Sequence, residues 1–258
     1  MNIVVCVKQV PDTAVERRLS ADGTLDRASL DGLINELDEY AIEEGLKIAE
    51  AHGGEVTILS MGPAKAAESI RKALSMGADK AIHVLDDGLA GSDAVETSLA
   101  LAEALKQAGF DLVIFGSEST DARTGMVPAM VAERLGVPQL TLASKVDISG
   151  PDVTIRRVTD DGYQVVTGAL PAVVSVVEKI NEPRYPTFKG IMAAKKKPVR
   201  TLTLADLGLG AGSVGLANAA SWVEDFAARP PRAAGVVVKD EGDGGVSAAG
   251  FLAERKFI

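Results

Sequence analysis

Short apolar runs alternate with amphipathic stretches along the first half of the chain. In the amphipathic stretches, apolar residues recur every three or four positions, which is the spacing of a helix with one buried face. Strands and helices that alternate in this way require right-handed crossovers, so the pattern predicts an α/β fold with a doubly wound parallel sheet. The predicted strands are 2–7, 55–61, 80–85 and 112–115, and the predicted helices are 35–51, 64–76, 93–108 and 125–135.

The pattern changes after residue 140. Extended runs joined by turn residues replace the alternation, and they predict antiparallel additions to the parallel sheet. The last run, at 172–177, is almost wholly apolar and is typical of a strand buried on both faces. Beyond it the periodicity fades, and linker-like segments such as 229–232 lead to an apolar end that predicts a short helix. We therefore expect an α/β domain over 1–198 and an extended arm over 199–258 that packs on a partner subunit.

Composition narrows the kinds of chemistry that the chain can carry. Hydrophobic residues make up 47% and charged residues 24% of a chain with a net charge of -9, which argues against nucleic acid as the main partner. The single cysteine, Cys6, excludes an internal disulfide, and its apolar surroundings predict an inert buried thiol. His52 and His83 are far apart, so we expect no metal site. With no secretory signal or long apolar run, we expect a cytoplasmic protein without membrane insertion.

Glycine and polar residues follow three of the predicted strands. Ligands of open parallel sheets bind at the carboxyl ends of strands, so Val7-Lys8, Met61-Gly62 and the loop 116–125 would meet at such a site. The loop leads into a helix whose first N–H groups can bind phosphate, although an ordinary solvated loop explains the pattern equally well. The candidate residues here are Lys8, Gly116, Ser117, Ser119, Thr120, Asp121, Arg123, Thr124, Gly125, Met126 and Val127.

A second candidate segment follows the last apolar strand. Pro183 and Pro186 should stop any regular element, and large apolar side chains then stand beside basic ones, which is typical of a protein-binding loop. A packed corner, with Tyr185 and Phe188 folded into the chain's own core, fits the same residues. The segment comprises Arg184, Tyr185, Pro186, Thr187, Phe188, Lys189, Gly190, Ile191 and Met192.

Two further motifs have simpler interpretations. The run Lys195-Lys196-Lys197 is typical of a solvated face, although it could also steer acidic partners toward the neighbouring segment. The residues 210–215 match Gly-x-Gly-x-x-Gly, but no strand precedes them and no helix opens at them. A dinucleotide-binding fingerprint needs both, so we interpret 210–215 as a flexible linker.

Several motifs, spread over nearly the whole chain, resemble the small, or beta, subunit of electron transfer flavoproteins. The most specific is the run from Asn181-Glu182-Pro183-Arg184-Tyr185 to Ala193-Ala194-Lys195-Lys196-Lys197. The other motifs are Val4–Asp12, Asn35–Asp38, Ala41–Glu44, Met61–Ala64, Ile70–Lys80 and Gly116–Asp121.

This resemblance implies a Rossmann-like, adenine-nucleotide-binding domain and an electron-carrier subunit without catalytic side chains. In such heterodimers the alpha subunit holds most of the FAD site, and the beta subunit closes it and binds a structural AMP. The beta subunit also docks acyl-CoA or related dehydrogenases, as in fatty acid β-oxidation, and electrons pass through FAD to a quinone reductase. Phe188 matches the apolar anchor for these dehydrogenases. The residues that would line the adenine and ribose are Cys6, Val7, Asn35, Asp38 and Met61.

Two alternatives remain open at this point. The loop reads Gly-Ser-Glu-Ser-Thr-Asp where the family usually has Gly-Lys-Gln-Ala-Ile-Asp. One alternative is therefore a bifurcating flavoprotein, with a second FAD in place of AMP. The other is a stand-alone nucleotide-binding signalling domain of the stress-protein type, which would form a homodimer without flavin. The apolar arm and the segment around Phe188 favour a subunit of a heterodimer.

Overall fold

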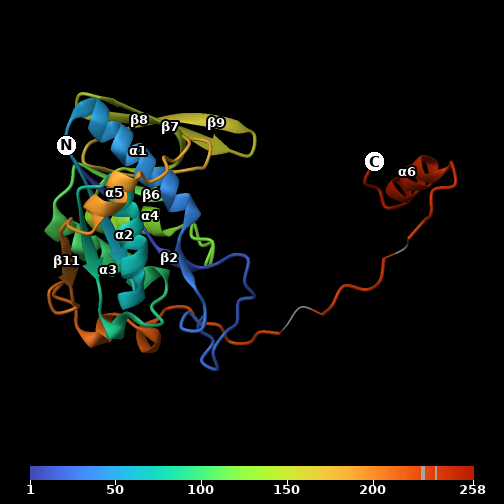
Figure 1. The fold of residues 1–258 in the computed structure, drawn as a ribbon, viewed down its shortest axis with the longest axis horizontal. Helices are drawn as coiled ribbons and strands as arrows, with labels where there is room; N and C mark the ends of the chain where they lie inside the picture. The colour runs from blue at the N-terminus through green and yellow to red at the C-terminus, as the bar shows by residue number, and fades with distance from the viewer. Residues whose placement is uncertain (228–229, 236) are drawn as a thin grey trace. The chain divides into compact units, whose positions relative to one another are not determined.

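A computed structural model describes residues 1–227, 230–235 and 237–258 (Figure 1). The chain divides into two compact units, Met1–Glu224 and Asp225–Ile258. The linker expected at 229–232 falls partly outside the described residues, because Arg229 is not among them. The first unit contains the sheet and both candidate segments.

The middle layer of the first unit is a large sheet. Its strands are β1 (Asn2–Cys6), β4 (Glu55–Met61), β5 (Lys80–Val84), β6 (Leu112–Gly116), β7 (Gln139–Ser149), β8 (Asp152–Thr159), β9 (Gly162–Ala169), β10 (Ala172–Val176) and β11 (Val199–Leu202). Their order is β11-β5-β4-β1-β6-β10-β7-β8-β9. Neighbours from β11 to β7 are parallel, and β8 and β9 continue the sheet antiparallel. The predicted doubly wound parallel sheet with antiparallel additions is confirmed.

Helices cover both faces of this sheet. They are α1 (Glu36–His52), α2 (Ala67–Met76), α3 (Ala94–Ala108), α4 (Val127–Leu135) and α5 (Phe188–Ala194). One face of the sheet packs against α1 and α2, and the other packs against α3 and α4. Among the described residues, no helix combines the length and apolarity that a membrane crossing requires.

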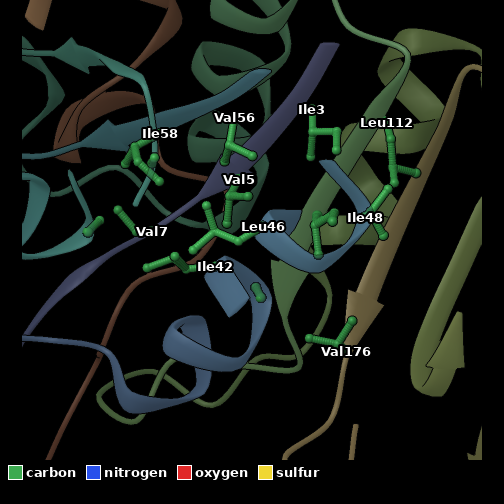
Figure 2. Close-up of a cluster of buried hydrophobic side chains, with 14 of the residues drawn as sticks. Ile3, Val5, Val7, Ile42, Leu46, Ile48, Val56, Ile58, Leu112 and Val176 are labelled. Carbon is green, nitrogen blue, oxygen red and sulfur yellow. The ribbon is translucent and has the colours of Figure 1, made fainter. Parts of the chain in front are cut away.

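The alternation of side chains along β1 explains the two layers. Successive strand residues point to opposite faces, so Ile3 and Val5 contact the α1 side and Val4 and Cys6 contact the α3 side. Figure 2 shows Ile3 and Val5 among the side chains of α1, including Leu46. Burial on both faces makes β1 the centre of the core.

The helix ends differ slightly from the expectations. The helix expected from residue 64 begins as a 3-10 turn (Ala64–Ala66), and the one expected from residue 125 begins at Val127. Asp93 caps α3 by accepting hydrogen bonds from the N–H groups of Val95 and Glu96 at 2.9 and 3.1 Å. Asn35 precedes α1, but its side chain makes no capping hydrogen bond.

The chain segments outside the main alternation also differ in part. The strand expected among the antiparallel runs, β10, is parallel and lies between β6 and β7. A strand that joins the middle of a parallel sheet in this way must be apolar on both faces, as β10 is. Two short strands, β2 (Gln9–Pro11) and β3 (Gly32–Ile34), pair at the base of a polar excursion over residues 12–31, within which Leu19 bridges Leu25.

The first unit extends beyond the expected boundary at residue 198. Val199–Leu202 pairs with β5 as β11, and the first unit ends at Glu224. The second unit contains one helix, α6 (Gly244–Glu254), within its described residues, near the apolar end where a helix was expected.

The segment 210–215 is not the flexible linker that we expected. Val214 is 1% exposed and belongs to the core on the α3 side. The Gly215 N–H donates to Ser92 Oγ at 2.9 Å, and the Leu216 N–H donates to the Ala90 carbonyl oxygen at 3.1 Å. The segment contains a short 3-10 turn and no strand–helix junction, so it does not form a dinucleotide-binding fingerprint.

We predict that Gly215→Ala lowers the free energy of unfolding by about 1–3 kcal/mol. Gly215 has φ 90°, and a Cβ atom there would lie 2.6 Å from the Gly88 carbonyl oxygen. The matched control is Gly210→Ala, because Gly210 has φ -86° and open space around its Cβ position. Urea unfolding measures both variants, and equal stabilities would contradict the packed arrangement of this segment.

Candidate functional site

The first candidate site lies where the strand order reverses. The chain leaves β1 toward β4 on one side, and later returns to β6 on the other side of β1. Open α/β sheets bind ligands in the crevice that such a reversal leaves at the carboxyl ends of the strands. Lys8 follows β1 and Gly116 ends β6, so the structure brings these two predicted residues to the same crevice.

Asp38 joins the two strand ends to the start of α1. Its Oδ2 accepts a hydrogen bond of 2.8 Å from the Lys8 N–H. Gly116 passes so close that a Cβ atom there would lie 2.6 Å from Asp38 Oδ1. Residue 116 must therefore be glycine, because a larger side chain would clash with Asp38.

Asn35 ties the loop after β6 to the same helix. Its Nδ2 donates to Asp38 Oδ1 and to the Glu118 carbonyl oxygen, each at 2.9 Å. Its Oδ1 accepts a hydrogen bond of 3.1 Å from the Thr120 N–H. Asn35 is 1% exposed, so these contacts are shielded from water. This use of the carboxamide explains why Asn35 does not cap α1.

Burial changes the protonation of two groups in this crevice. It raises the pKa of Asp38 to about 7, although hydrogen bonds from Asn35 and Lys8 and the charge of Lys8 act in the opposite direction. Burial, followed by the nearby Asp38 carboxyl, also raises the pKa of Cys6 well above its usual value. Cys6 is buried as expected, and its burial favours the neutral form of the thiol.

A cluster of charges holds the outer part of the loop. Lys8 Nζ donates to Asp121 Oδ1 at 2.9 Å and to Ser119 Oγ at 3.3 Å, and Arg27 pairs with the other oxygen of Asp121. Arg17 donates to the Thr120 carbonyl oxygen at 2.7 Å. Burial raises the pKa of Asp121, but the charges and hydrogen bonds of Lys8 and Arg27 outweigh burial and hold it well below its usual range.

Sequence reasoning missed Arg17 and Arg27. Both belong to the polar excursion between β2 and β3, and they contact a loop that lies about a hundred positions later in the chain. Two arginines in a short polar excursion were only a weak signal of a role in the site, because most arginines in such segments are solvated. The contacts mean that the excursion covers the loop after β6.

Donor groups without partners remain beside this cluster. Thr120 is 5% exposed, and its Oγ1 has no hydrogen-bond partner among the residues that the structure describes. Five positions further along the chain, the N–H groups of Gly125, Met126 and Val127 have no acceptor within the part of the chain that the structure describes. A buried hydroxyl normally has a partner. The crevice therefore contains donors suited to an anionic ligand at the start of α4.

Glu96 is another buried polar residue that sequence reasoning missed. It is 5% exposed in the first turn of α3, and neither carboxyl oxygen has a partner within the described chain. Because α3 connects β5 to β6, its first turn lies at the carboxyl ends of the strands. A glutamate in an amphipathic helix is usually exposed, so the pattern provided no signal for it.

The second candidate segment is anchored at its start by Arg184. Its Nε donates to Glu43 Oε2 at 2.7 Å, and its Nη1 donates to Glu50 Oε1 at 2.6 Å, so it contacts two carboxylates of α1. These hydrogen bonds raise the pKa of Arg184 above its usual value. Arg184 therefore holds the segment against α1.

The rest of this segment is a short helix and not only a loop. Thr187 caps α5, because its Oγ1 accepts a hydrogen bond of 3.0 Å from the Gly190 N–H. Pro186 lies just before this cap, so α5 begins where the restriction by proline ends. Gly190 packs on α2, since a Cβ atom there would lie 2.5 Å from the Ser75 carbonyl oxygen.

Large apolar side chains of the segment are exposed. Tyr185 is 91% exposed and Phe188 is 81% exposed. The alternative of a corner packed into the chain's own core is therefore wrong for both residues. Ile191 and Met192 are also about half exposed, so the four side chains form an apolar patch of the kind that marks protein interfaces.

The lysine run has divided roles. Lys197 Nζ donates to the carbonyl oxygens of Leu74, Gly77 and Ala78 at 2.9, 3.2 and 2.6 Å, and so binds the end of α2. The expectation of a solvated run is therefore wrong for Lys197. Lys195 and Lys196 are exposed, as expected.

Together, the fold and the crevice define a Rossmann-like α/β protein with a candidate ligand site at a topological switch point. The family model of the electron transfer flavoprotein domain matches residues 22–207. The chain is 53% identical to the electron transfer flavoprotein subunit beta of Mycobacterium tuberculosis (100% of this chain, 99% of that protein). It is 52% identical to that of Mycobacterium leprae (100% and 99%) and 36% identical to that of Megasphaera elsdenii (94% and 93%).

The chain therefore belongs to the electron transfer flavoprotein family, and its full-length similarity is to beta subunits. The resemblance noted from the motifs is confirmed. Membership indicates a component of electron transport that works with a flavin and with an alpha subunit. The individual contacts expected for a nucleotide and for a dehydrogenase stay predictions.

We predict that the stability of the chain relative to Asp38→Asn falls by about 2–3 kcal/mol between pH 5 and pH 8. The folded-state pKa of Asp38, about 7, lies above its unfolded value, so the folded protein binds the extra proton in this range. The stability contributed by neutral Asp38 is complete at low pH and is lost as pH rises through 7. The exposed Asp161→Asn is the control, measured with the others by urea unfolding at each pH. A constant difference between the native chain and Asp38→Asn would contradict this assignment.

Proposed function

We propose that this chain closes the FAD site of an alpha subunit, holds a structural AMP and docks dehydrogenases in the cytoplasm. The observation that carries the proposal is the exposed, firmly anchored patch of Tyr185, Phe188, Ile191 and Met192 on a chain of this family. FAD, held mostly by the alpha subunit, accepts electrons from acyl-CoA or related dehydrogenases and passes them to a quinone reductase. The chain itself needs no acid, base or nucleophile for this role.

The crevice fits the phosphate end of AMP. The N–H groups of Gly125, Met126 and Val127 and the hydroxyl of Thr120, none of which has a partner among the described residues, would supply hydrogen-bond donors. Lys8, Arg17 and Arg27 add positive charge around the same loop, of which Asp121 neutralises only part. Ser117, Ser119, Arg123 and Thr124 belong to the same loop and would supply further donors to the ligand.

The adenosine end would lie along the strand ends. The backbone groups of Cys6 and Val7, together with Met61, border the crevice at β1 and β4. The side chains of Asn35 and Asp38 are already hydrogen-bonded to each other and to neighbouring backbone. We infer that these two residues shape the wall of the site more than they grip the ligand.

The docking role rests on how the apolar patch is held. Arg184 fixes one end of the segment to α1, while Arg71 donates to the Ala194 carbonyl oxygen at 2.7 Å and fixes the other end to α2. A preorganised anchor loses little conformational entropy on binding. One buried aromatic such as Phe188 supplies much of the contact energy of an interface.

The second unit would pack on the alpha subunit. No residue of α6 is buried, although Val246, Phe251 and Leu252 are apolar. An apolar helix with no buried face needs a partner surface. The arm in this proposal begins at Asp225, where the second unit begins.

Identification of the bound ligands tests the nucleotide site. The chain is produced together with its alpha subunit, the yellow complex is denatured, and the released ligands are quantified by chromatography and mass spectrometry. We expect one AMP for each FAD. Two FAD and no AMP would establish the bifurcating form, and ATP without flavin would establish the signalling domain.

Replacement of the anchor tests the docking role. We expect Phe188→Ala to raise the KM for an acyl-CoA dehydrogenase of the same organism by about 10–100-fold, since a buried aromatic anchor contributes about 2 kcal/mol or more. The flavin content should be unchanged. Val165→Ala is the matched control, because Val165 is an exposed apolar residue of β9 outside the patch. Unaltered reduction kinetics in Phe188→Ala would remove the anchor assignment.

A further inference from the structure

A hollow lies next to the apolar patch, between α2 and α5. Its volume is about 340 Å³, and Ile191 and Ala194 are the apolar residues that line it. The two helices lie side by side in Figure 1 and pack through Gly190 and Ser75. Ile191 both lines the hollow and belongs to the patch, three positions after Phe188. A partner that receives Phe188 would therefore also cover the hollow.

Polar contacts join the two helices that line the hollow. Arg71 donates to the Ala194 carbonyl oxygen at 2.7 Å, and Lys197 binds three carbonyl oxygens at the end of α2. These contacts join the last turns of α2 and α5 through charge-assisted hydrogen bonds. These contacts fix how α2 and α5 lie against each other beside the hollow.

The charges around the hollow are mostly positive. Arg71, Lys72 and Lys195 line it, against a single carboxylate, Glu68. Lys72 is paired with Glu39, and Arg71 is partly used by Ala194. Lys195 is exposed and makes no ion pair or hydrogen bond with any residue that the structure describes. It is therefore the cation best able to meet a charge from outside.

We propose that this hollow receives an acidic side chain of the dehydrogenase, whose carboxylate meets Lys195. The proposal rests on the docking role of Phe188 and adds a second contact. Phe188 enters the partner, whereas here a side chain of the partner enters this chain. The methylene groups of a glutamate suit the apolar lining residues Ile191 and Ala194, and its carboxylate suits the basic lining residues. Because the chain carries a net charge of -9, this local excess of positive charge selects partners that are acidic at the same place.

Two contacts would fix the orientation of the partner. Phe188 alone could rotate in an apolar pocket, since hydrophobic contact is not directional. A charged pair several ångströms away restricts that rotation and adds specificity more than affinity. The hollow thereby determines which acidic partners dock productively.

Charge reversal at Lys195 tests the proposal in the complete heterodimer. We expect Lys195→Glu to raise the KM for a purified acyl-CoA dehydrogenase about 10-fold at low salt, with kcat and flavin content unchanged. Lys196→Glu is the matched control, because Lys196 is the exposed neighbour outside the hollow, and we expect its effect to stay below about 3-fold. The rise of KM with added NaCl should also be smaller in Lys195→Glu than in the native complex.

The outcomes separate this inference from the docking role. Equal effects of Lys195→Glu and Lys196→Glu would show only diffuse steering and would overturn the hollow. If Phe188→Ala weakens docking while Lys195→Glu does not, the hollow is excluded and the anchor stands. If Phe188→Ala has no effect, the docking role itself fails. If Lys195→Glu loses flavin, Lys195→Gln replaces it as the test of the hollow, because it removes the charge without reversing it. We expect Lys195→Gln to raise KM about 3-fold.

Discussion

The crevice of this protein depends on the buried carboxamide of Asn35. It donates to Asp38 and to the Glu118 carbonyl oxygen and accepts from the Thr120 N–H, so one side chain joins the start of α1 to the loop after β6. At a topological switch point, the loops that follow two neighbouring strands run in opposite directions. The hydrogen bonds of the sheet do not join these loops to each other. Removal of the carboxamide would leave buried polar groups on both sides without partners, which is more costly than the loss of a single hydrogen bond. This contact fixes the inner part of the loop at Glu118 and Thr120, while Lys8, Arg17 and Arg27 hold its outer part.

Charge has a similar structural role at the docking surface. Arg184 binds the carboxylates of α1, while Arg71 and Lys197 bind carbonyl oxygens of α5 and α2. These polar contacts hold a helix of only seven residues, which would not be stable in isolation. Because the polar contacts carry the anchoring, the apolar side chains of Tyr185 and Phe188 are left free for a partner. The two candidate segments share α1: Asn35, just before its start, contacts the loop after β6, and Glu43 and Glu50 farther along contact Arg184.

Prediction from the sequence succeeded where the signal was local. The alternation of β1, α1, β4 and α2 follows from hydrophobic periodicity, and the strand ends then indicate the position of the crevice. It was less successful where distant segments pair. The parallel pairing of β11 with β5 and the burial of Val214 depend on where a glycine-rich segment returns to the sheet. Arg17, Arg27 and Glu96 were missed for the same reason, because a charged residue on a local pattern is usually solvated.

Periodicity, turn residues and family motifs belong to the chain before it folds, and they were enough to establish the doubly wound sheet and the electron transfer flavoprotein family. The exposure of a side chain and its hydrogen-bond partners are decided only when distant segments of the chain pack together. Phe188 could have been a core residue, Lys197 could have been solvated, and Asn35 could have been a helix cap, since each residue type suits both environments. The three-dimensional path of the chain decided among them, because burial depends on neighbours that lie many positions away in the sequence.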